Sequence, residues 1–117
     1  MNKIILTGRL TKDPESKETE SGSLITTIFL AVRREYKNKE TNEYEADFIR
    51  LKSFNKQALY IHQYIKKGDL VQIDGSIRTG SYEKEGEKMY TTDYIISSIN
   101  KLLSSNKDGQ NNFNELK

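Results

Sequence analysis

The order of helical and extended segments narrows the possible folds of this chain more than any other property of its sequence. Apolar residues at positions 54, 58, 61 and 65 lie at spacings of four, three and four, which places them on one face of a helix. Strand patterns, with alternating or β-branched and aromatic residues, occupy five segments: residues 2–10, 24–32, 46–54, 70–78 and 88–99. The second of these is apolar enough to be buried on much of both faces.

Three strands, one helix and two further strands are the order of elements in the OB-fold. The sequence therefore predicts an all-β protein, a five-stranded OB-fold barrel with one helix between strands 3 and 4. Residues 13–22 predict a turn or loop, and residues 33–45 predict a long hairpin loop, because their charges alternate without apolar periodicity. Ser53 or Asn55 can cap the start of the helix, and Gly68 suits a left-handed residue at its end.

Composition places the chain among small soluble proteins. It has 117 residues, of which 34% are hydrophobic and 31% charged, which fits one domain with a single core. The absence of cysteine excludes disulfides, thiolate zinc sites and cysteine nucleophiles. The longest apolar run, residues 28–32, is far shorter than the ~20 residues that span a bilayer. We therefore expect a cytoplasmic protein with no membrane contact.

The composition shifts at Ser104 to Ser, Asn, Asp, Gly and Gln. Such a segment cannot bury enough apolar surface to offset the entropy lost on ordering. The sequence therefore predicts an OB-fold domain over residues 1–103 and a short, flexible, disordered C-terminal tail over residues 104–117.

Residues 46–54 carry the pattern that points to a ligand. Side chains two apart on a strand share one face, and here one face reads aromatic, basic, basic, aromatic: Phe48, Arg50, Lys52 and Phe54. It would make a poor core face, since two unpaired cations would be buried. It suits single-stranded nucleic acid, because cations pair with phosphates and rings stack on bases. The alternative is a solvated strand face, with both rings tucked under barrel edges and the helix.

Two further groups of aromatic and basic residues lie in or beside predicted strands. One follows the second strand and consists of Arg33, Arg34 and Tyr36, with Lys37 and Lys39 close by. The other lies in the hairpin of the last two strands and consists of Arg78, Tyr82 and Lys84. The net charge is only +2, so the case for a polyanionic ligand depends on this pattern and not on overall charge.

The sequence offers no candidate catalytic or metal site. His62 is the single histidine and has no partners at metal-ligand spacing, so we interpret it as structural. Gly75 and Gly80 have the spacing of a P-loop, but Ser81 and Tyr82 stand where Lys and Ser or Thr are required. We therefore predict a non-enzymatic protein without a cofactor or metal.

Four segments of the chain resemble the bacterial single-stranded DNA-binding protein family, in order and in register over about residues 1–100. They are NKIILTGRLTKDPE, ADFIRLKSFNKQA, YIKKGDLVQIDGSIRTGSY and YTTDYI. The resemblance implies an OB-fold that assembles as a homotetramer and binds single-stranded DNA in replication, recombination and repair, in association with the nucleoid. It also implies base stacking at Tyr36, Phe48, Phe54 and Tyr82.

The chain departs from the family pattern in two places. Several members carry tryptophan at matching stacking positions, whereas this chain has none, so tyrosine and phenylalanine would stack instead. The family's tail ends in an acidic tip that closes with Pro-Phe, whereas this chain ends NNFNELK. The sequence therefore gives no support for recruiting replication and repair proteins through an acidic tail.

The predicted function is sequence-independent binding and protection of single-stranded DNA. The predicted DNA-binding residues are Arg33, Arg34, Tyr36, Phe48, Arg50, Lys52, Phe54, Lys56, Arg78, Tyr82 and Lys84. Two alternatives stay open: an OB-fold RNA binder, and an OB-fold protein-docking subunit of a replication assembly with weak nucleic-acid binding.

Overall fold

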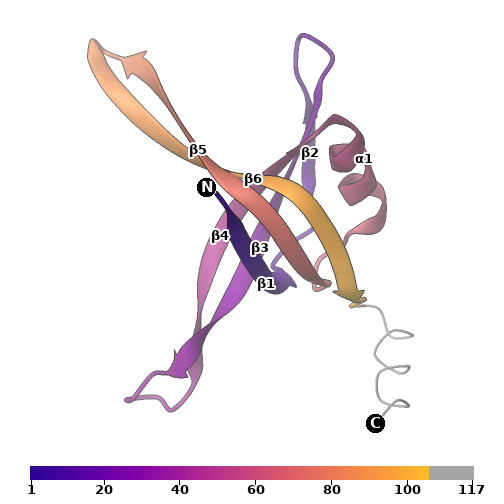
Figure 1. The fold of residues 1–117 in the computed structure, drawn as a ribbon, viewed down its shortest axis with the longest axis vertical. Coiled ribbons are helices and arrows are strands. Elements are labelled where there is room, and N and C mark those ends of the chain that lie inside the picture. The colour runs from indigo at the N-terminus through magenta and orange to yellow at the C-terminus, as the bar shows by residue number, and fades with distance from the viewer. Residues whose placement is uncertain (106–117) are drawn as a thin grey trace.

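The computed structural model describes residues 1–105, and within that range the chain forms six strands and one helix (Figure 1). In chain order they are β1 (Ile4–Leu10), β2 (Glu15–Glu18), β3 (Leu24–Lys37), β4 (Tyr44–Phe54), α1 (Asn55–Tyr64), β5 (Leu70–Lys84) and β6 (Glu87–Leu103). All five predicted strands and the helix between the third and fourth of them are present. β2 is an additional strand.

The barrel closes where β1 meets β3. Strands pair in the order β1-β5-β6-β4-β3-β2, and β1 also pairs with β3, so the sheet returns on itself. Arg9 marks the crossing, because it pairs with Leu70 of β5 and with Ala31 of β3. Gly8 permits the close approach, since a Cβ there would lie 2.3 Å from the carbonyl oxygen of Ala31. This closure confirms the predicted five-stranded OB-fold barrel, and β2 lies at its edge.

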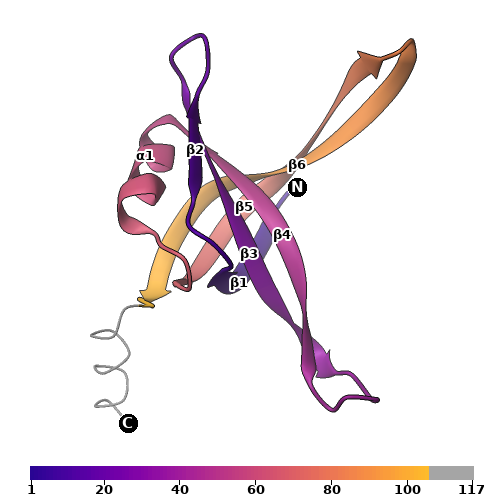
Figure 2. The ribbon, with the colours of Figure 1, turned by 180° about the vertical axis from the view of Figure 1, so that it is seen from behind.

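The β3–β4 and β5–β6 hairpins extend beyond the barrel as long arms (Figure 1), and Figure 2 shows both from behind. We call them the β3–β4 arm (residues 33–47) and the β5–β6 arm (residues 77–94). The predicted long loop over residues 33–45 is wrong, because strand pairing continues to Lys37 and Tyr44 and leaves only residues 38–43 as the turn. A two-stranded ribbon has no core, so its backbone pairing does not require the apolar periodicity on which the prediction relied.

β2 is the second departure from the predicted elements. The sequence predicts a turn or loop over residues 13–22, whereas residues 15–18 pair antiparallel with β3. The strand is polar throughout, and side-chain hydrogen bonds hold it in place. Ser16 Oγ lies 2.8 Å from Thr26 Oγ1 and 2.9 Å from His62 Nδ1. His62 therefore joins the helix to β2.

The helix begins without the cap that the sequence predicts. Phe54 is the N-cap residue and makes no side-chain cap hydrogen bond. Ser53 instead donates to Gln57 Oε1 at 2.6 Å, and Asn55 accepts from a backbone amide of β3 at 3.3 Å. Both candidate caps are therefore engaged in other contacts, which local sequence could not reveal.

The core fills the inside of the barrel, with α1 packed against β3 and β4. Its buried residues come from every barrel strand and from the helix and its C-cap: Leu10, Ile28, Leu30, Leu51, Ile61, Ile65, Val71, Ile73 and Ile96. This single cluster fixes which side of each strand faces inward. The opposite sides are therefore available for contacts with a ligand.

A buried carboxylate ties the end of β6 to the turn before β5. Asp69 is 1% exposed. Its Oδ2 accepts from the Lys66 amide at 2.8 Å, and its Oδ1 accepts from the Ser105 amide at 2.9 Å. Lys101 Nζ lies 3.6 Å from the same Oδ2. Apart from its first two residues, the predicted disordered tail lies outside the described residues.

We expect Asp69→Ala to lower the free energy of unfolding by about 1–3 kcal/mol, because buried amides lose their acceptor. Asp74→Ala is the matched control, since Asp74 pairs with Lys3 on the surface and such pairs contribute about 0–1 kcal/mol. Urea denaturation followed by circular dichroism measures both variants. Equal losses in the two would contradict the role assigned to Asp69.

Candidate nucleic-acid interface

The outer side of β4 presents the alternating rings and cations that the sequence predicts. Phe48 is 76% exposed and Phe54 is 37% exposed. Between them Arg50 is exposed and Lys52 is partly buried. Leu51, which separates the two cations along the strand, is fully buried in the core. The division of β4 into an inner apolar side and an outer aromatic and basic side is therefore confirmed.

β3 extends this surface with an aromatic ring that the sequence analysis missed. Phe29 pairs with Arg50 and Ala31 pairs with Phe48, and directly paired residues share one side of a sheet. Phe29 is only partly buried and lies outside the core cluster. The apolar run of residues 24–32 hid it, although separating odd from even positions would have found it. We call the joint surface the aromatic–basic face; it consists of Phe29, Phe48, Arg50, Lys52 and Phe54.

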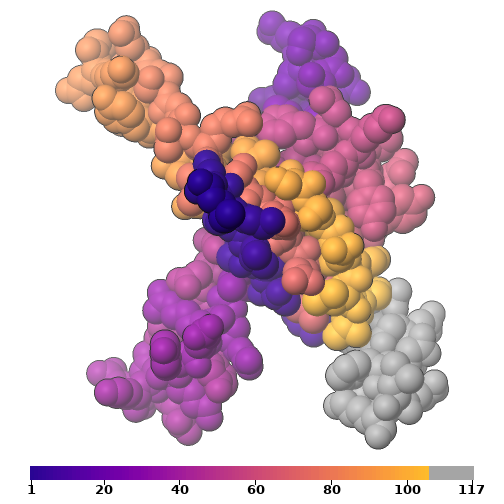
Figure 3. Space-filling view, viewed as in Figure 1, coloured from indigo at the N-terminus to yellow at the C-terminus, as the bar shows by residue number. Residues whose placement is uncertain are grey.

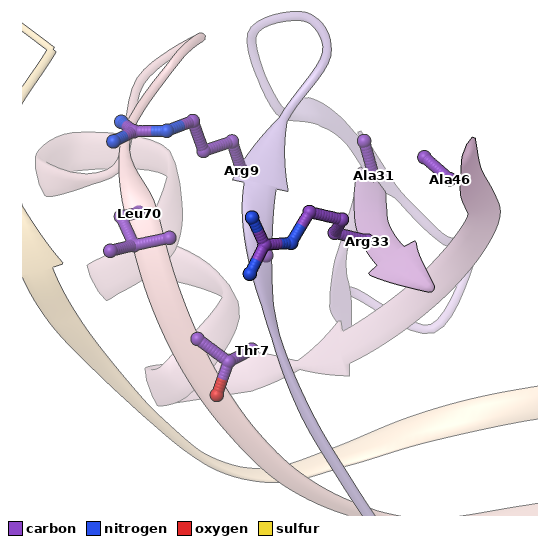
Figure 4. Close-up of a pocket in the computed structure, with 7 residues that line it drawn as sticks. Thr7, Arg9, Ala31, Arg33, Ala46 and Leu70 are labelled. Carbon is purple, nitrogen blue, oxygen red and sulfur yellow. The ribbon is translucent and has the colours of Figure 1, made fainter. Parts of the chain in front are cut away.

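An open pocket of about 520 Å³ adjoins this face where β1 crosses β3, and it is lined by Thr7, Gly8, Arg9, Ala31, Arg33, Ala46 and Leu70. Figure 4 shows Arg33 reaching toward β1 and Arg9 reaching toward the start of β5. Arg9 Nη1 donates to the carbonyl oxygen of Gly68 at 3.0 Å. Two guanidinium groups beside small side chains favour an anionic ligand such as a phosphate. The sequence predicts Arg33 as a DNA contact but does not single out Arg9.

The β3–β4 arm places Arg33 and Arg34 on opposite sides. Arg33 pairs with Ala46, so it shares the outer side of the sheet with Phe48. The carbon of its guanidinium lies 4.4 Å from the centroid of the Tyr44 ring, an aromatic contact that sequence analysis did not anticipate. Tyr36, a predicted stacking residue, is 81% exposed farther along the arm.

Arg34 is engaged with two carboxylates on the other side of the arm. Its Nε and Nη2 donate to Asp47 Oδ1 at 3.1 Å and 2.9 Å, and its Nη1 lies 3.1 Å from Glu45 Oε2. The hydrogen bond from Arg34, with its charge, lowers the pKa of Asp47. Arg34 would have to leave these partners before it could contact a phosphate.

The β5–β6 arm carries Arg78, Tyr82 and Lys84, and all three are exposed. They stand at even positions of β5 and so share one side of the strand. Arg78 pairs in register with Asp93, whose Oδ1 lies 3.3 Å from Lys52 Nζ of β4. Asp93 therefore connects this arm to the aromatic–basic face. The space-filling view shows the arm standing out from the body of the molecule (Figure 3).

The structure thus gathers some predicted residues and separates others. The four on β4 form one surface on the barrel, and Arg33 and Arg78 lie where the two arms leave it. Tyr36 and Tyr82 lie out on the two different arms (Figure 1). Lys56 is exposed in the first turn of α1, two residues after Phe54.

Metal-ligating side chains do not gather anywhere in residues 1–105, where no group of three or more His, Cys, Asp or Glu could hold an ion. No helix in this part of the chain is long and apolar enough to cross a membrane.

Exposed rings that flank cations match the chemistry of an unpaired nucleic-acid strand. Its bases offer faces on which rings stack, and its phosphates pair with Lys and Arg. Residues 1–102 match the single-strand binding protein family. This chain belongs to that family.

Curated proteins that are similar to this chain are named single-stranded DNA-binding proteins. Single-stranded DNA-binding protein 1 of Staphylococcus aureus is 43% identical over 109 residues, which cover 92% of this chain and 69% of the relative. Single-stranded DNA-binding protein 2 of another strain is 42% identical over 111 residues, covering 94% and 79%. The single-stranded DNA-binding protein of Bacillus cereus is 40% identical over 111 residues, covering 94% and 65%. The family resemblance is therefore confirmed, and the individual contact residues stay predictions.

We expect Phe48→Ala and Leu51→Ala to affect folding very differently, because the two side chains lie on opposite sides of β4. Loss of an exposed ring changes the free energy of unfolding by about 0.5 kcal/mol or less. Truncation of a buried leucine costs about 2–5 kcal/mol. Thermal and urea unfolding of the two variants measure the difference. A Phe48→Ala variant as unstable as Leu51→Ala would place Phe48 in the core and refute the outer face.

Proposed function

We propose that this member of the single-strand binding protein family binds single-stranded DNA without sequence preference and protects it during replication, recombination and repair. Bases stack on Phe48 and Phe54 of the barrel and on Tyr36 and Tyr82 of the arms. Phosphates pair with the basic residues beside these rings: Arg33, Arg34, Arg50, Lys52, Lys56, Arg78 and Lys84. Recognition is independent of sequence because every base offers a π-face.

The exposure of Phe48 and Arg50 on the outer side of β4 is the observation that supports this proposal most strongly. The Phe48 ring has three-quarters of its surface in water, so it contributes little to the core. It exposes apolar area that a stacked base would cover. Arg50 next to this ring is exposed, and its partner in register on β3 is the Phe29 ring rather than a carboxylate. A surface that exposes rings beside a guanidinium has the two features that an unpaired strand needs, stacking and charge neutralisation.

The remaining parts of the proposal concern assembly and location. We propose a homotetramer in the cytoplasm that acts by binding and has no catalytic step of its own. Membership of the family supports this assembly, and so do exposed apolar side chains away from the aromatic–basic face, among them Ile5 of β1 and Tyr64 of α1. Light scattering of the free protein measures its assembly, and a monomer at working concentration would contradict the tetramer.

The affinity for an unstructured oligonucleotide should fall linearly with salt on logarithmic axes, with a slope of about −0.7 for each phosphate neutralised. Arg50→Gln should flatten the slope by about one contact for each subunit engaged. Lys67→Gln, on the turn after the helix, is the matched control and should leave the slope unchanged. A slope indistinguishable from zero in the unmodified protein would remove phosphate pairing from the proposal.

Phe48→Ala should weaken binding by about 1–3 kcal/mol for each base that stacks on the ring. Tyr60→Ala, which removes a partly exposed ring from α1, is the control and should bind as the unmodified protein does. Fluorescence anisotropy of a labelled oligonucleotide measures both, with an RNA of the same sequence to separate DNA from RNA binding. Weak binding that neither substitution changes would favour a protein-docking subunit instead.

A further inference from the structure

Lys12 covers the ring of Phe29 on the aromatic–basic face. Its Nζ lies 4.0 Å from the ring centroid and 3.0 Å from Glu15 Oε1. About half of the Lys12 side-chain surface is exposed, 52%, and that of Glu15 is exposed to a similar extent. One flexible side chain, held by one surface carboxylate, therefore lies over a ring that the core does not enclose.

Hydrogen bonds fix the residue before Lys12 beside Phe29. The Thr11 amide donates to the carbonyl oxygen of Phe29 at 2.8 Å, and the Thr11 hydroxyl donates to the same oxygen at 3.2 Å. The chain that leaves β1 is thus attached to β3 beside Phe29, and the next residue is Lys12. This attachment places the Lys12 backbone beside Phe29, from where its ammonium reaches the ring.

Phe29 has neighbours of the same kind as the rings proposed to stack on bases. It pairs with Arg50, two residues from Phe48 along β4, so a guanidinium lies beside it on the neighbouring strand. Its neighbours at the next outward positions of β3, Thr27 and Ala31, are small and do not wall it off. A strand that follows β4 from Phe48 to Phe54 passes within reach of this ring.

We infer that Phe29 is a further base-stacking position and that Lys12 is its replaceable cover. When single-stranded DNA binds, the Lys12 ammonium moves from the ring and Glu15 to a phosphate of the same strand, and a base takes its place on the ring. This inference rests on the proposed function, since it adds a position to the same interface.

The exchange is favourable because the contacts that break are weak and those that form are stronger. A cation over an exposed ring and a surface ion pair are both minor contributions, while stacking of a base is a larger one. The ammonium does not lose its counter-charge either, because a phosphate replaces the carboxylate. The cover therefore shields the ring from water in the free protein without blocking it.

A tryptophan at position 29 tests this directly, because the chain has no tryptophan of its own. Phe29→Trp supplies a single indole, whose fluorescence stacked thymines quench. Titration with oligothymidylate should quench it, and Tyr60→Trp on α1 should show no quenching under the same conditions. If the Phe29→Trp signal does not change while anisotropy shows full binding, Phe29 does not stack and the inference falls, although the proposed function stands.

Two further variants test the roles of the Phe29 ring and of Lys12 separately. Phe29→Leu keeps apolar bulk beneath Lys12 but removes the π-face, and it should weaken oligothymidylate binding by about fivefold or more, the lower end of the stacking range. Lys12→Gln should reduce the salt slope by about 0.7 for each subunit engaged. Lys66→Gln, after the helix, should leave the slope unchanged.

If the salt slope of Lys12→Gln equals that of the unmodified protein, the Lys12 ammonium does not move to a phosphate, and that part of the inference is wrong. The melting temperature of Phe29→Leu serves as the control for folding. A value within a few degrees of that of the unmodified protein shows that a loss of affinity is not caused by unfolding. If the unmodified chain itself does not bind oligothymidylate, the proposed function fails and the inference fails with it, a result distinct from those above.

Discussion

The close approach of β1 to β3 at Gly8 is what lets the barrel close. A side chain there would collide with the carbonyl oxygen of Ala31, so only glycine allows the sheet to close on itself. Once the sheet is closed, each strand has one side toward a common core and one toward water. Closure also brings Arg9 beside the outer side of β3 and directs the chain after β1 across Phe29. The proposed binding surface is thus a consequence of how the barrel closes.

Strand alternation then gives the two sides of β4 different chemistry. Leu51 points inward and supplies core packing, while its neighbours Arg50 and Lys52 point outward and cannot be buried without partners. The same closed barrel that hides apolar side chains therefore exposes cations and rings at a fixed spacing. Ion pairs already occupy two cations near this surface, since Asp93 pairs with Lys52 and two acidic residues pair with Arg34. A strand of DNA that bound here as proposed would have to compete with these pairs.

Sequence alone predicted most of the barrel because its strands carry strong alternation and the helix carries a clear apolar stripe. It also predicted the outer side of β4, where parity separates Phe48 from Leu51. It failed where backbone pairing alone decides the structure, as in β2 and the β3–β4 arm, which have no apolar pattern to detect. Phe29 was missed because the residues before and after it in the chain, Ile28 and Leu30, are also apolar, so no alternation marks it as outward-facing. The pairing of Arg34 with acidic residues and the attachment of Lys12 beside Phe29 depend on strand register, which a single sequence does not specify.

Photocrosslinking tests the central claim, that the outer side of β3 and β4 with the two arms is the surface that meets DNA. The described aromatic residues are spread over both the proposed surface and the helix, so crosslinks from a halogenated oligonucleotide, located by mass spectrometry, map the contact directly. We predict crosslinks at Phe48 and Phe54, at Phe29, and at the tyrosines of the arms. Crosslinks concentrated on Tyr60 and Tyr64 of α1, with none on β4, would contradict it.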